Sequence, residues 1–260
     1  MKAGAKARAK ARACLIDIDG TVRDGMVVVP GAAAALGALR RAGIPYRLAT
    51  NTTRMPRSAI VRELAAMGIA AAAADVVTAA RAAAAWLGAR GARRVALLIA
   101  PATREEFAGL EEEDERPEFV VVGDLGEAWT FARLNAGFRA LQGGAQLVAL
   151  QRNRWWDAGA GPQLDAGAFV AALEYASGQM AVLVGKPDPA FFEAAVAGLG
   201  VPIGEVAVVG DDPESDIAGA QAAGAIAVAV RTGKGRTAGF AGADAVLGSI
   251  ADLPRWLGIG

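Results

Sequence analysis

The chain has 260 residues, of which 54% are hydrophobic, and its 27 basic residues balance its 27 acidic ones. This length suits one large domain or two modest ones, and the balanced charge gives no field that would favour nucleic acid or a membrane surface. There is no histidine and a single cysteine, Cys14, which we expect to be buried. Their scarcity excludes Ser-His-Asp and Cys-His catalysis, the usual zinc sites and an intrachain disulfide. Any chemistry must therefore use carboxylates, lysine and hydroxyls, with a hard metal ion as an optional addition.

The N-terminal stretch MKAGAKARAKAR (1–12) is strongly basic and lacks the apolar core of a signal peptide. We expect it to be a disordered, solubilising tail. Farther along, no apolar run approaches the about 18–20 residues of a membrane span. The sequence therefore predicts a cytoplasmic protein with neither a membrane nor a nucleic-acid partner.

Short apolar runs then alternate with helical patterns, which is typical of βαβ units around a mainly parallel sheet. Helices are expected to begin at Ser58 and at Asp188, where Pro189 takes the first helical position, and a third covers residues 215–224. The expected fold is α/β, with a Rossmann-like parallel sheet and helices on both of its faces. Its predicted strands are 13–18, 46–50, 180–184, 206–210 and 225–230.

The middle of the chain has its own strand pattern, at 94–100, 118–123 and 145–150, interleaved with Ala-rich helical segments. It reads as a second α/β unit inserted into the first. We expect a core domain over 13–79 and 181–260, and an inserted domain over 80–180. Within the insert, the acidic run at 111–118 is expected to be a solvated loop or helix edge. Trp155 and Trp156 are expected to fill the core of the insert or its contact with the core domain, and the alternative is a binding role in which they stack on a ring.

Polar residues stand at the carboxyl ends of four predicted core strands, which is the edge where open α/β sheets bind ligands. Each could by itself be an ordinary turn, cap or surface residue, but their recurrence favours one shared site. In chain order they are Asp17 and Asp19, Thr50 and Asn51, Lys186, and Asp211 and Asp212, with Asp216 entering the next helix.

Three or more carboxylates around one point require a cation, and oxygen ligands favour Mg²⁺. An ionised aspartate can attack a phosphoryl group and form an aspartyl phosphate. Lys186, Thr50 and Asn51 are suited to match the negative charge of that group. A second aspartate, Asp19, is placed to protonate the leaving oxygen and later to deprotonate water.

Four motifs in order, DIDGT (17–21), TN (50–51), GKPDP (185–189) and GDDPESD (210–216), resemble those of the haloacid dehalogenase superfamily of phosphatases. The resemblance runs from about residue 13 to residue 250. It implies a magnesium-dependent phosphatase acting on a small phosphorylated metabolite. The implied roles are Asp17 as nucleophile, Asp19 as general acid/base, Mg²⁺ on the Asp17 carboxylate, the Asp19 backbone carbonyl and Asp211, phosphate on Thr50, Asn51 and Lys186, and support from Asp212 and Asp216.

The insertion lies between the second and third motifs, since too few residues follow Thr21 to form a domain there. This placement is similar to a cap in the group of NagD-type phosphatases, p-nitrophenyl phosphatases and pyridoxal phosphate phosphatase. The stretches LATN, LEYASG and VRTGKGR resemble the phospholysine phosphohistidine inorganic pyrophosphate phosphatase branch, which implies pyrophosphate or phosphoramidate bonds as further substrates. Cap-mediated dimers occur in related families, so a homodimer through the cap stays open.

Two other functions use the same kind of residues. A phosphoacceptor switch of the receiver type also places aspartates, a hydroxyl residue and a Lys-Pro pair at strand ends. A degenerate member of the family would serve as a binding or scaffold protein. The inserted unit and the position of Asp19 argue against a switch, and the complete set of motif residues argues against a degenerate member.

Overall fold

The computed structural model describes residues 11–157 and 161–259. By their internal contacts the residues divide into two compact units. The first runs to Thr50 and continues over Ile60–Val77 and Lys186–Gly260, and the second comprises Asn51–Ala59 and Thr78–Gly185. Residues 1–10 of the expected basic tail lie outside the described residues. Arg12, near its end, donates from its backbone N–H to the Glu205 carbonyl and pairs with the Glu205 carboxylate at 2.9 Å.

A six-stranded sheet forms the centre of the first unit. The pairs that β1 makes with its two neighbours, and those that follow toward β15, are parallel. Because both faces of such a sheet are covered, its strands are nearly continuous apolar runs, and this confirms four of the five predicted core strands. The short strands β5 and β15 were not predicted. In the order β15-β14-β13-β1-β4-β5, the strands are Ala245–Leu247, Ile226–Val230, Val206–Gly210, Ala13–Asp17, Tyr46–Thr50 and Val76–Thr78.

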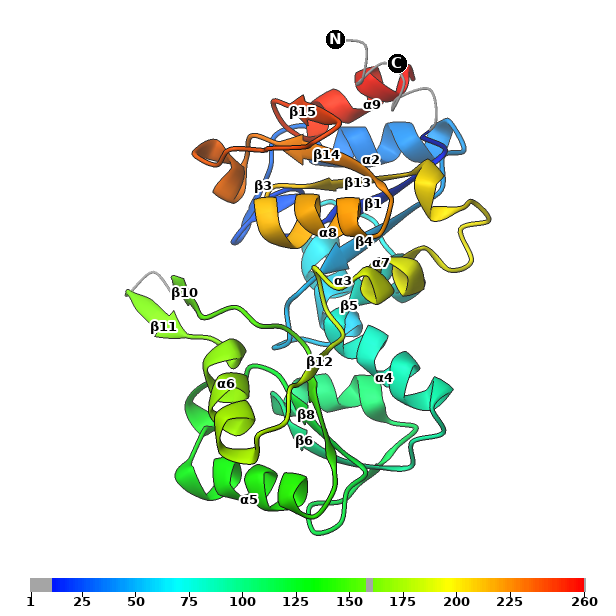
Figure 1. Ribbon diagram of the computed structural model, residues 1–260. Coiled ribbons are helices and arrows are strands. Elements are labelled where there is room, and N and C mark those ends of the chain that lie inside the picture. The colour runs from blue at the N-terminus through cyan, green and yellow to red at the C-terminus, as the bar shows by residue number, and fades with distance from the viewer. Residues whose placement is uncertain (1–10, 158–160, 260) are drawn as a thin grey trace. The chain divides into compact units, whose positions relative to one another are not determined.

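The chain moves outward from the middle of this sheet in both directions. From β1 it proceeds to β4, and from β13 to β14, on the opposite side. Because parallel crossovers are right-handed, these two steps place their helices on opposite faces, as Figure 1 shows for α2 (Ala32–Arg41) and α8 (Gly219–Ala222). The strand order thus reverses between β1 and β13, and ligands of open α/β sheets bind at such a switch point.

The remaining helices that lie wholly or partly in the first unit show whether the predicted start signals are correct. Asp188 caps α7 (Pro189–Val196) by accepting from the Ala190 N–H, as expected. The expected cap at Ser58 is wrong, because α3 (Arg57–Ala66) begins one residue earlier and the Ser58 hydroxyl instead donates to Glu105. The predicted helix at 215–224 begins as a π-helix, η5 (Pro213–Ala218), and continues as α8; α9 (Leu253–Leu257) lies near the C-terminus.

A five-stranded parallel sheet forms the second unit, in the order β12-β9-β8-β6-β7. One prediction fails here: the strand before Lys186, β12, pairs with β9 of this sheet and not with the core sheet. The acidic run likewise begins as an edge strand, β7, and not as a loop. The strands are β6 (Arg94–Leu98), β7 (Glu111–Glu112), β8 (Phe119–Val122), β9 (Gln146–Ala149) and β12 (Val182–Leu183).

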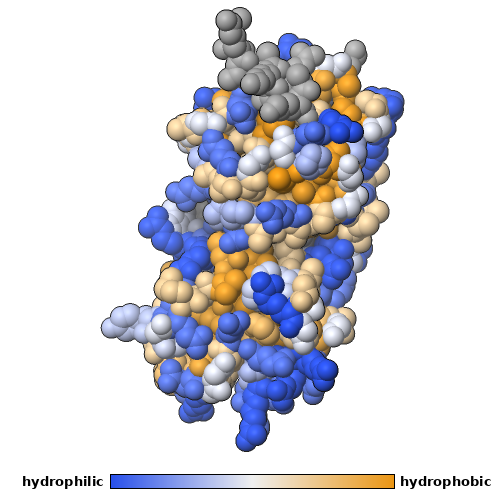
Figure 2. Space-filling view, turned by 45° about the vertical axis from the view of Figure 1, so that its right-hand side comes forward, coloured by the Kyte–Doolittle hydropathy of each residue, from blue (hydrophilic) through white to orange (hydrophobic). Residues whose placement is uncertain are grey.

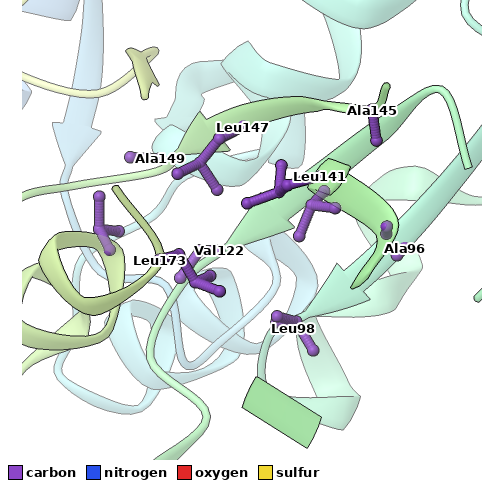
Figure 3. Close-up of a cluster of buried hydrophobic side chains, with 11 residues drawn as sticks. Ala96, Leu98, Val122, Leu141, Ala145, Leu147, Ala149 and Leu173 are labelled. Atoms are coloured by element: carbon purple, nitrogen blue, oxygen red, sulfur yellow. The ribbon is translucent and has the colours of Figure 1, made fainter. Parts of the chain in front are cut away.

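Helices α5 (Phe131–Gln142) and α6 (Ala166–Ser177) pack on one face of the second sheet and enclose an apolar core with it (Figure 3). Side chains alternate across a strand, so Val120 and Val122 of β8 enter this core. Phe119 points the other way and meets the edge of Trp86 on α4 (Ala79–Ala89), with ring centroids 6.0 Å apart. The second sheet is therefore also covered on both faces.

Two hairpins complete the strands. In the first unit β2 (Arg23–Asp24) pairs with β3 (Val27–Val28), and in the second β10 (Trp155–Asp157) pairs with β11 (Pro162–Leu164). Trp155 does not fill the core of the second unit, because it belongs to a two-stranded ribbon and is 59% exposed. A contact with the core domain or with a ligand stays a prediction for this residue. The side chain of Trp156 lies outside the described part of the chain.

Short helical turns join these elements. They are η1 (Ala73–Asp75), η2 (Pro101–Phe107), η3 (Gly126–Ala128), η4 (Ile203–Glu205), η6 (Gly233–Arg236) and η7 (Ile250–Asp252). Over the described ranges, no helix is long and apolar enough to cross a membrane. Figure 2 shows hydrophilic residues distributed over the visible face, with apolar areas between them.

Candidate active site

A buried cluster of three carboxylates and one lysine lies at the switch point of the first sheet. Asp17 ends β1, and Asp211 follows β13 directly. The Lys186 ammonium donates to Asp17 Oδ1 and to Asp216 Oδ1, both at 2.6 Å. Carboxylate oxygens of Asp17, Asp211 and Asp216 lie within 4.8 Å of one another. All four residues are at most 7% exposed, so the charges face each other with little water to screen them.

The loop after β14 closes over Asp211. The backbone N–H of Lys234 donates to Asp211 Oδ2 at 2.7 Å. Gly20 and Gly233, both with positive φ, approach this carboxylate so closely that a Cβ at either position would collide with it. Glycine is needed at both places, for backbone conformation and for space. The stretch VRTGKGR (230–236) therefore contributes a backbone donor to the cluster.

The proton affinities of the cluster reflect its crowding. Burial is the main cause that raises the pKa of Asp17 well above its usual value, and the neighbouring carboxylates raise it further against the opposing effect of Lys186. Burial and Asp216 raise the pKa of Asp211 to about 7. Burial disfavours the charge on Lys186, but Asp17 and Asp216 outweigh it and raise its pKa. The lysine stays charged, but its single charge does not offset three ionised carboxylates, so bound protons or a second cation must balance the rest.

The donor set fits a divalent cation. Among the described residues, Asp17 Oδ2 is a buried carboxylate oxygen without a hydrogen-bond partner. A buried acceptor of this kind is costly to leave unsatisfied. The groups beside it that could bind a metal ion are the carboxylates of Asp211 and Asp216. Hard cations prefer such oxygen ligands, whereas softer metals prefer sulfur or nitrogen. The cluster is thus incomplete without a cation or a donor from a ligand.

The second aspartate of the DIDGT motif is bound by other partners than this cluster. Asp19 Oδ1 accepts from Arg23 Nε at 2.9 Å, and Asp19 Oδ2 accepts from the Thr50 hydroxyl at 3.0 Å. Its side chain is 47% exposed, whereas Asp17 is buried. The two carboxylates, one residue apart, therefore have different surroundings: one is buried beside a lysine, and the other is held at the solvent boundary by an arginine and a hydroxyl.

Asp212 and Asp216 organise the turn that presents Asp211. Asp212 caps η5 by accepting from the N–H groups of Glu214 and Ser215. Burial opposes its charge, but its bond with the Lys234 ammonium and these backbone donors lower its pKa. Asp216 Oδ2 accepts from the Asp212 N–H at 3.1 Å. Both residues hold backbone and lysine in place.

Asn51 is grouped with the second unit, although its neighbour Thr50 belongs to the first. Its amide oxygen lies beside Gly185, 3.1 Å from where a Cβ of that residue would stand. Of the eight predicted site residues, the structure brings seven together in the first unit and leaves Asn51 in the second. Lys186 joins the cluster even though the strand before it belongs to the other sheet.

Comparison with known proteins agrees with this geometry. Residues 14–112 match the family model of haloacid dehalogenase-like hydrolases, and residues 183–253 match a second model described as HAD-hydrolase-like. The haloacid dehalogenase-like hydrolase domain-containing protein 2 of Homo sapiens is 35% identical over 225 residues, which are 86% of each chain. The chain belongs to the haloacid dehalogenase-like hydrolases.

Other proteins named as phosphatases are similar to this chain over most of its length. The phospholysine phosphohistidine inorganic pyrophosphate phosphatase of Homo sapiens is 34% identical over 237 residues, covering 89% of this chain and 87% of its own. The solved structure of a 4-nitrophenylphosphatase from Thermotoga maritima superposes with a TM-score of 0.88 at 27% identity, covering 96% of this chain and 98% of that one. The resemblance read from the four motifs is confirmed.

Two residues of this hydrolase site were missed in the sequence. Arg23 is 4% exposed and contacts Asp19, but in the sequence it stands in VRDG, where an arginine beside an aspartate looks like a solvated turn. Lys234 contributes through its backbone, for which residue type gives no signal. Cys14 is buried as predicted, and burial raises the pKa of its thiol to about 12, so it stays an unreactive part of β1.

Proposed function

We propose that this hydrolase is a Mg²⁺-dependent phosphatase that cleaves a small phosphorylated metabolite through an aspartyl phosphate on Asp17. The observation that carries the proposal is the buried cluster of Asp17, Asp211, Asp216 and Lys186, with one oxygen of Asp17 left without a partner. A nucleophile needs such an oxygen, and a phosphoryl group needs the charge that surrounds it.

The Asp17 carboxylate, the Asp19 backbone carbonyl and Asp211 would hold the metal ion, with Asp216 and Asp212 as outer support. When bound, Mg²⁺ supplies positive charge that offsets the carboxylates and the phosphoryl oxygens. The Lys186 ammonium already lies 2.6 Å from Asp17 and is suited to bind a phosphoryl oxygen beside the nucleophile. Asn51 would add an amide donor. Thr50 would add its hydroxyl, which would leave Asp19 when it donates to the phosphate.

In the first step an oxygen of Asp17 attacks phosphorus, and the bond from phosphorus to the leaving oxygen breaks. Asp19 gives its proton to that oxygen, so the product leaves as a neutral alcohol. In the second step Asp19, now a carboxylate, takes a proton from water as the water attacks phosphorus. The bond to Asp17 then breaks, and inorganic phosphate is released. Asp17 is regenerated, and Asp19 again carries a proton.

Turnover of p-nitrophenyl phosphate, with Mg²⁺ and with excess EDTA, tests this proposal. Wild-type protein should release p-nitrophenolate only with the metal ion. Asp17→Asn removes the nucleophile and keeps the shape of the side chain, so activity should fall by at least about 10³-fold while circular dichroism is unchanged. Mg²⁺-dependent turnover retained by a folded Asp17→Asn protein would contradict the mechanism.

The receiver-type switch gives a different result in the same assay. It would accumulate a phospho-protein that persists for minutes without turnover. A scaffold protein would give neither phospho-protein nor product. Rapid release of phosphate, with phospho-Asp17 seen only transiently by mass spectrometry after acid quench, supports the phosphatase.

We also propose that residues 80–180 act as an inserted cap that selects the substrate. The proposal is supported by their position between the second and third motifs and by the compactness of the second unit. One relative is named for phospholysine, phosphohistidine and inorganic pyrophosphate, and a solved neighbour for 4-nitrophenyl phosphate. A panel of phosphate monoesters, pyrophosphate and phosphoramidates therefore identifies the substrate class. A homodimer through the cap stays a prediction, to be tested by size-exclusion chromatography with light scattering.

A further inference from the structure

Arg23 is a buried arginine placed between two carboxylates. Its Nε donates to Asp19 Oδ1 at 2.9 Å, and its Nη1 donates to Glu63 Oε2 on α3 at 2.5 Å. The side chain of Arg23 is 5% exposed, against 47% for Asp19 and 32% for Glu63. The arginine is therefore fixed by its packing and by Glu63, while the carboxylate that it holds remains accessible.

The backbone of the same loop is also closed around Arg23. Its N–H donates to the Ile18 carbonyl at 3.0 Å, and its carbonyl accepts from the Gly20 N–H at 2.6 Å. The loop that carries Asp19 is thus joined to Arg23 by main-chain and side-chain bonds together. On the opposite side, the Thr50 hydroxyl holds Asp19 Oδ2. Each oxygen of the Asp19 carboxylate then has a defined donor, and the orientation of the group is set.

We propose that Arg23, anchored by Glu63, is a positioning residue that orients the Asp19 carboxyl group for proton transfer to the leaving oxygen. The inference rests on the proposed function, in which Asp19 is the general acid. Proton transfer requires the acid within hydrogen-bond reach of the leaving oxygen and aimed at it. A half-exposed aspartate held by Thr50 alone would sample other rotamers in solvent. An arginine with a planar, rigid fork limits this freedom, and a lysine limits it less.

Arg23 exchanges no proton in this scheme. In the first step the Asp17 oxygen bonds to phosphorus, the leaving oxygen departs with the electron pair of its bond, and the proton of Asp19 neutralises it. Loss of Arg23 leaves the nucleophile and the groups proposed to bind phosphate untouched. The penalty should therefore depend on how much the leaving group needs a proton. A leaving group that is stable as an anion departs without one, whereas a basic one does not.

The test measures kcat/KM with Mg²⁺ for aryl phosphates of increasing leaving-group acidity, namely phenyl, p-nitrophenyl and 2,4-dinitrophenyl phosphate. For Arg23→Met we expect kcat/KM on phenyl phosphate to fall on the order of 10- to 100-fold, which is part of the usual contribution of a general acid. On 2,4-dinitrophenyl phosphate it should fall less than about threefold. Arg23→Lys should lie between Arg23→Met and wild type. Asp19→Asn should show the same selectivity more strongly.

Glu63→Gln gives an independent variant, because it loosens Arg23 without altering the loop of Asp19. It should show a smaller loss with the same preference for the acidic leaving group. Arg255→Met is the matched control: its side chain is 87% exposed and pairs at 3.4 Å with Asp252, so all three substrates should react at wild-type rates. Retained turnover of 2,4-dinitrophenyl phosphate shows in each variant that the fold and the phosphoryl site are intact.

Equal losses on all three substrates in Arg23→Met and Glu63→Gln would overturn the inference, because a merely structural role slows every leaving group alike. The same loss on every substrate in Asp19→Asn would overturn it too, since no acid would then need orienting. Should Arg23→Met fail to fold, the Glu63→Gln series decides alone. Failure of the proposed function looks different: wild-type protein would show no Mg²⁺-dependent turnover, or Asp17→Asn would retain it.

Discussion

The two parallel sheets of this chain both end in buried polar residues, but these residues are satisfied in different ways. At the carboxyl end of β8, Asp124 accepts from the Gly126 N–H and pairs with Arg54. After β9, the Gln151 amide donates to Asp165, which also caps α6. Each of these carboxylates is therefore bound by a hydrogen-bond donor or a cation of its own unit.

At the carboxyl edge of the first sheet the match is incomplete. Asp17, Asp211 and Asp216 share Lys186, and Asp17 Oδ2 has no partner in the described part of the chain. A folded protein accepts such an arrangement at a cost in stability, usually where a ligand or metal supplies what is missing. Buried polar residues at strand ends are therefore not enough to indicate a ligand or metal site. Such a site is indicated when these residues do not satisfy one another's charges and hydrogen bonds.

The largest expected effect follows from removing the lysine. Lys186→Met leaves Asp17 and Asp216 buried without their cation and should lower the free energy of unfolding by about 3–5 kcal/mol in Mg²⁺-free buffer. Urea denaturation measures it. Lys234→Met is the control, because that ammonium is 68% exposed and its pair should contribute at most about 1 kcal/mol. Equal losses in the two variants would contradict the view that the buried cluster depends on its lysine more than an exposed pair does.

Magnesium should act on the first unit and leave the second unchanged. At 100 times its dissociation constant, a ligand of the folded state stabilises by about 2.7 kcal/mol, so scanning calorimetry should show a higher transition temperature with Mg²⁺ than with EDTA. Asp211→Asn should reduce this increase. Glu106→Gln, in the second unit, should retain it. An Mg²⁺ effect that survives in Asp211→Asn would show that the ion binds elsewhere.

The stability of the metal-free protein should depend on pH through Asp211. The folded state keeps this proton up to about pH 7, whereas the unfolded chain releases it near 3.8. Between these values the folded state binds more protons, so raising the pH lowers the free energy of unfolding. Relative to wild type, Asp211→Asn should gain about 1–2 kcal/mol from pH 5 to pH 7 in EDTA, as followed by urea denaturation. A difference that does not change with pH would contradict the raised pKa.

The smallest effect is expected from a satisfied pair in the second unit. Arg57 binds the buried carboxylate of Glu106 at 2.9 Å, and its own backbone N–H donates to the same residue. Arg57→Met should cost about 1 kcal/mol, because the backbone bond remains. The double variant with Glu106→Gln should recover part of the loss. The stability loss of neither variant should depend on Mg²⁺. A loss that changes with Mg²⁺ in thermal unfolding would show that the metal ion also acts on the second unit.

Much of the site could be predicted because parallel strands leave a simple signature. An apolar run that ends abruptly in Asp17 or in Asp211 places the carboxylate at the sheet edge, whatever the rest of the fold. Lys186 was placed correctly for an incorrect reason, since β12 before it belongs to the other sheet. A two-residue strand carries too little pattern to reveal its partner.

Other features lacked any local signal. Arg23 looks solvated in the sequence but is buried, and its guanidinium pairs with Glu63 of α3. Trp155 looks like a core residue but is 59% exposed in its two-stranded ribbon. The strand β5 is lost among alanines that favour a helix. In each case a tertiary contact, or the lack of one, overrides the local preference.

The segment Asn51–Ala59 has a practical consequence for exchanging the inserted unit among relatives. Thr53 accepts from the Asp124 N–H and its carbonyl accepts from the Thr103 hydroxyl, while Arg57 pairs with Glu106, so this segment is bound to the inserted unit by buried polar contacts. A chimaera that transplants residues 80–180 alone would separate each of these partners. A transplant that includes 51–59 with 78–185 keeps them together and places one junction at the peptide bond between Thr50 and Asn51.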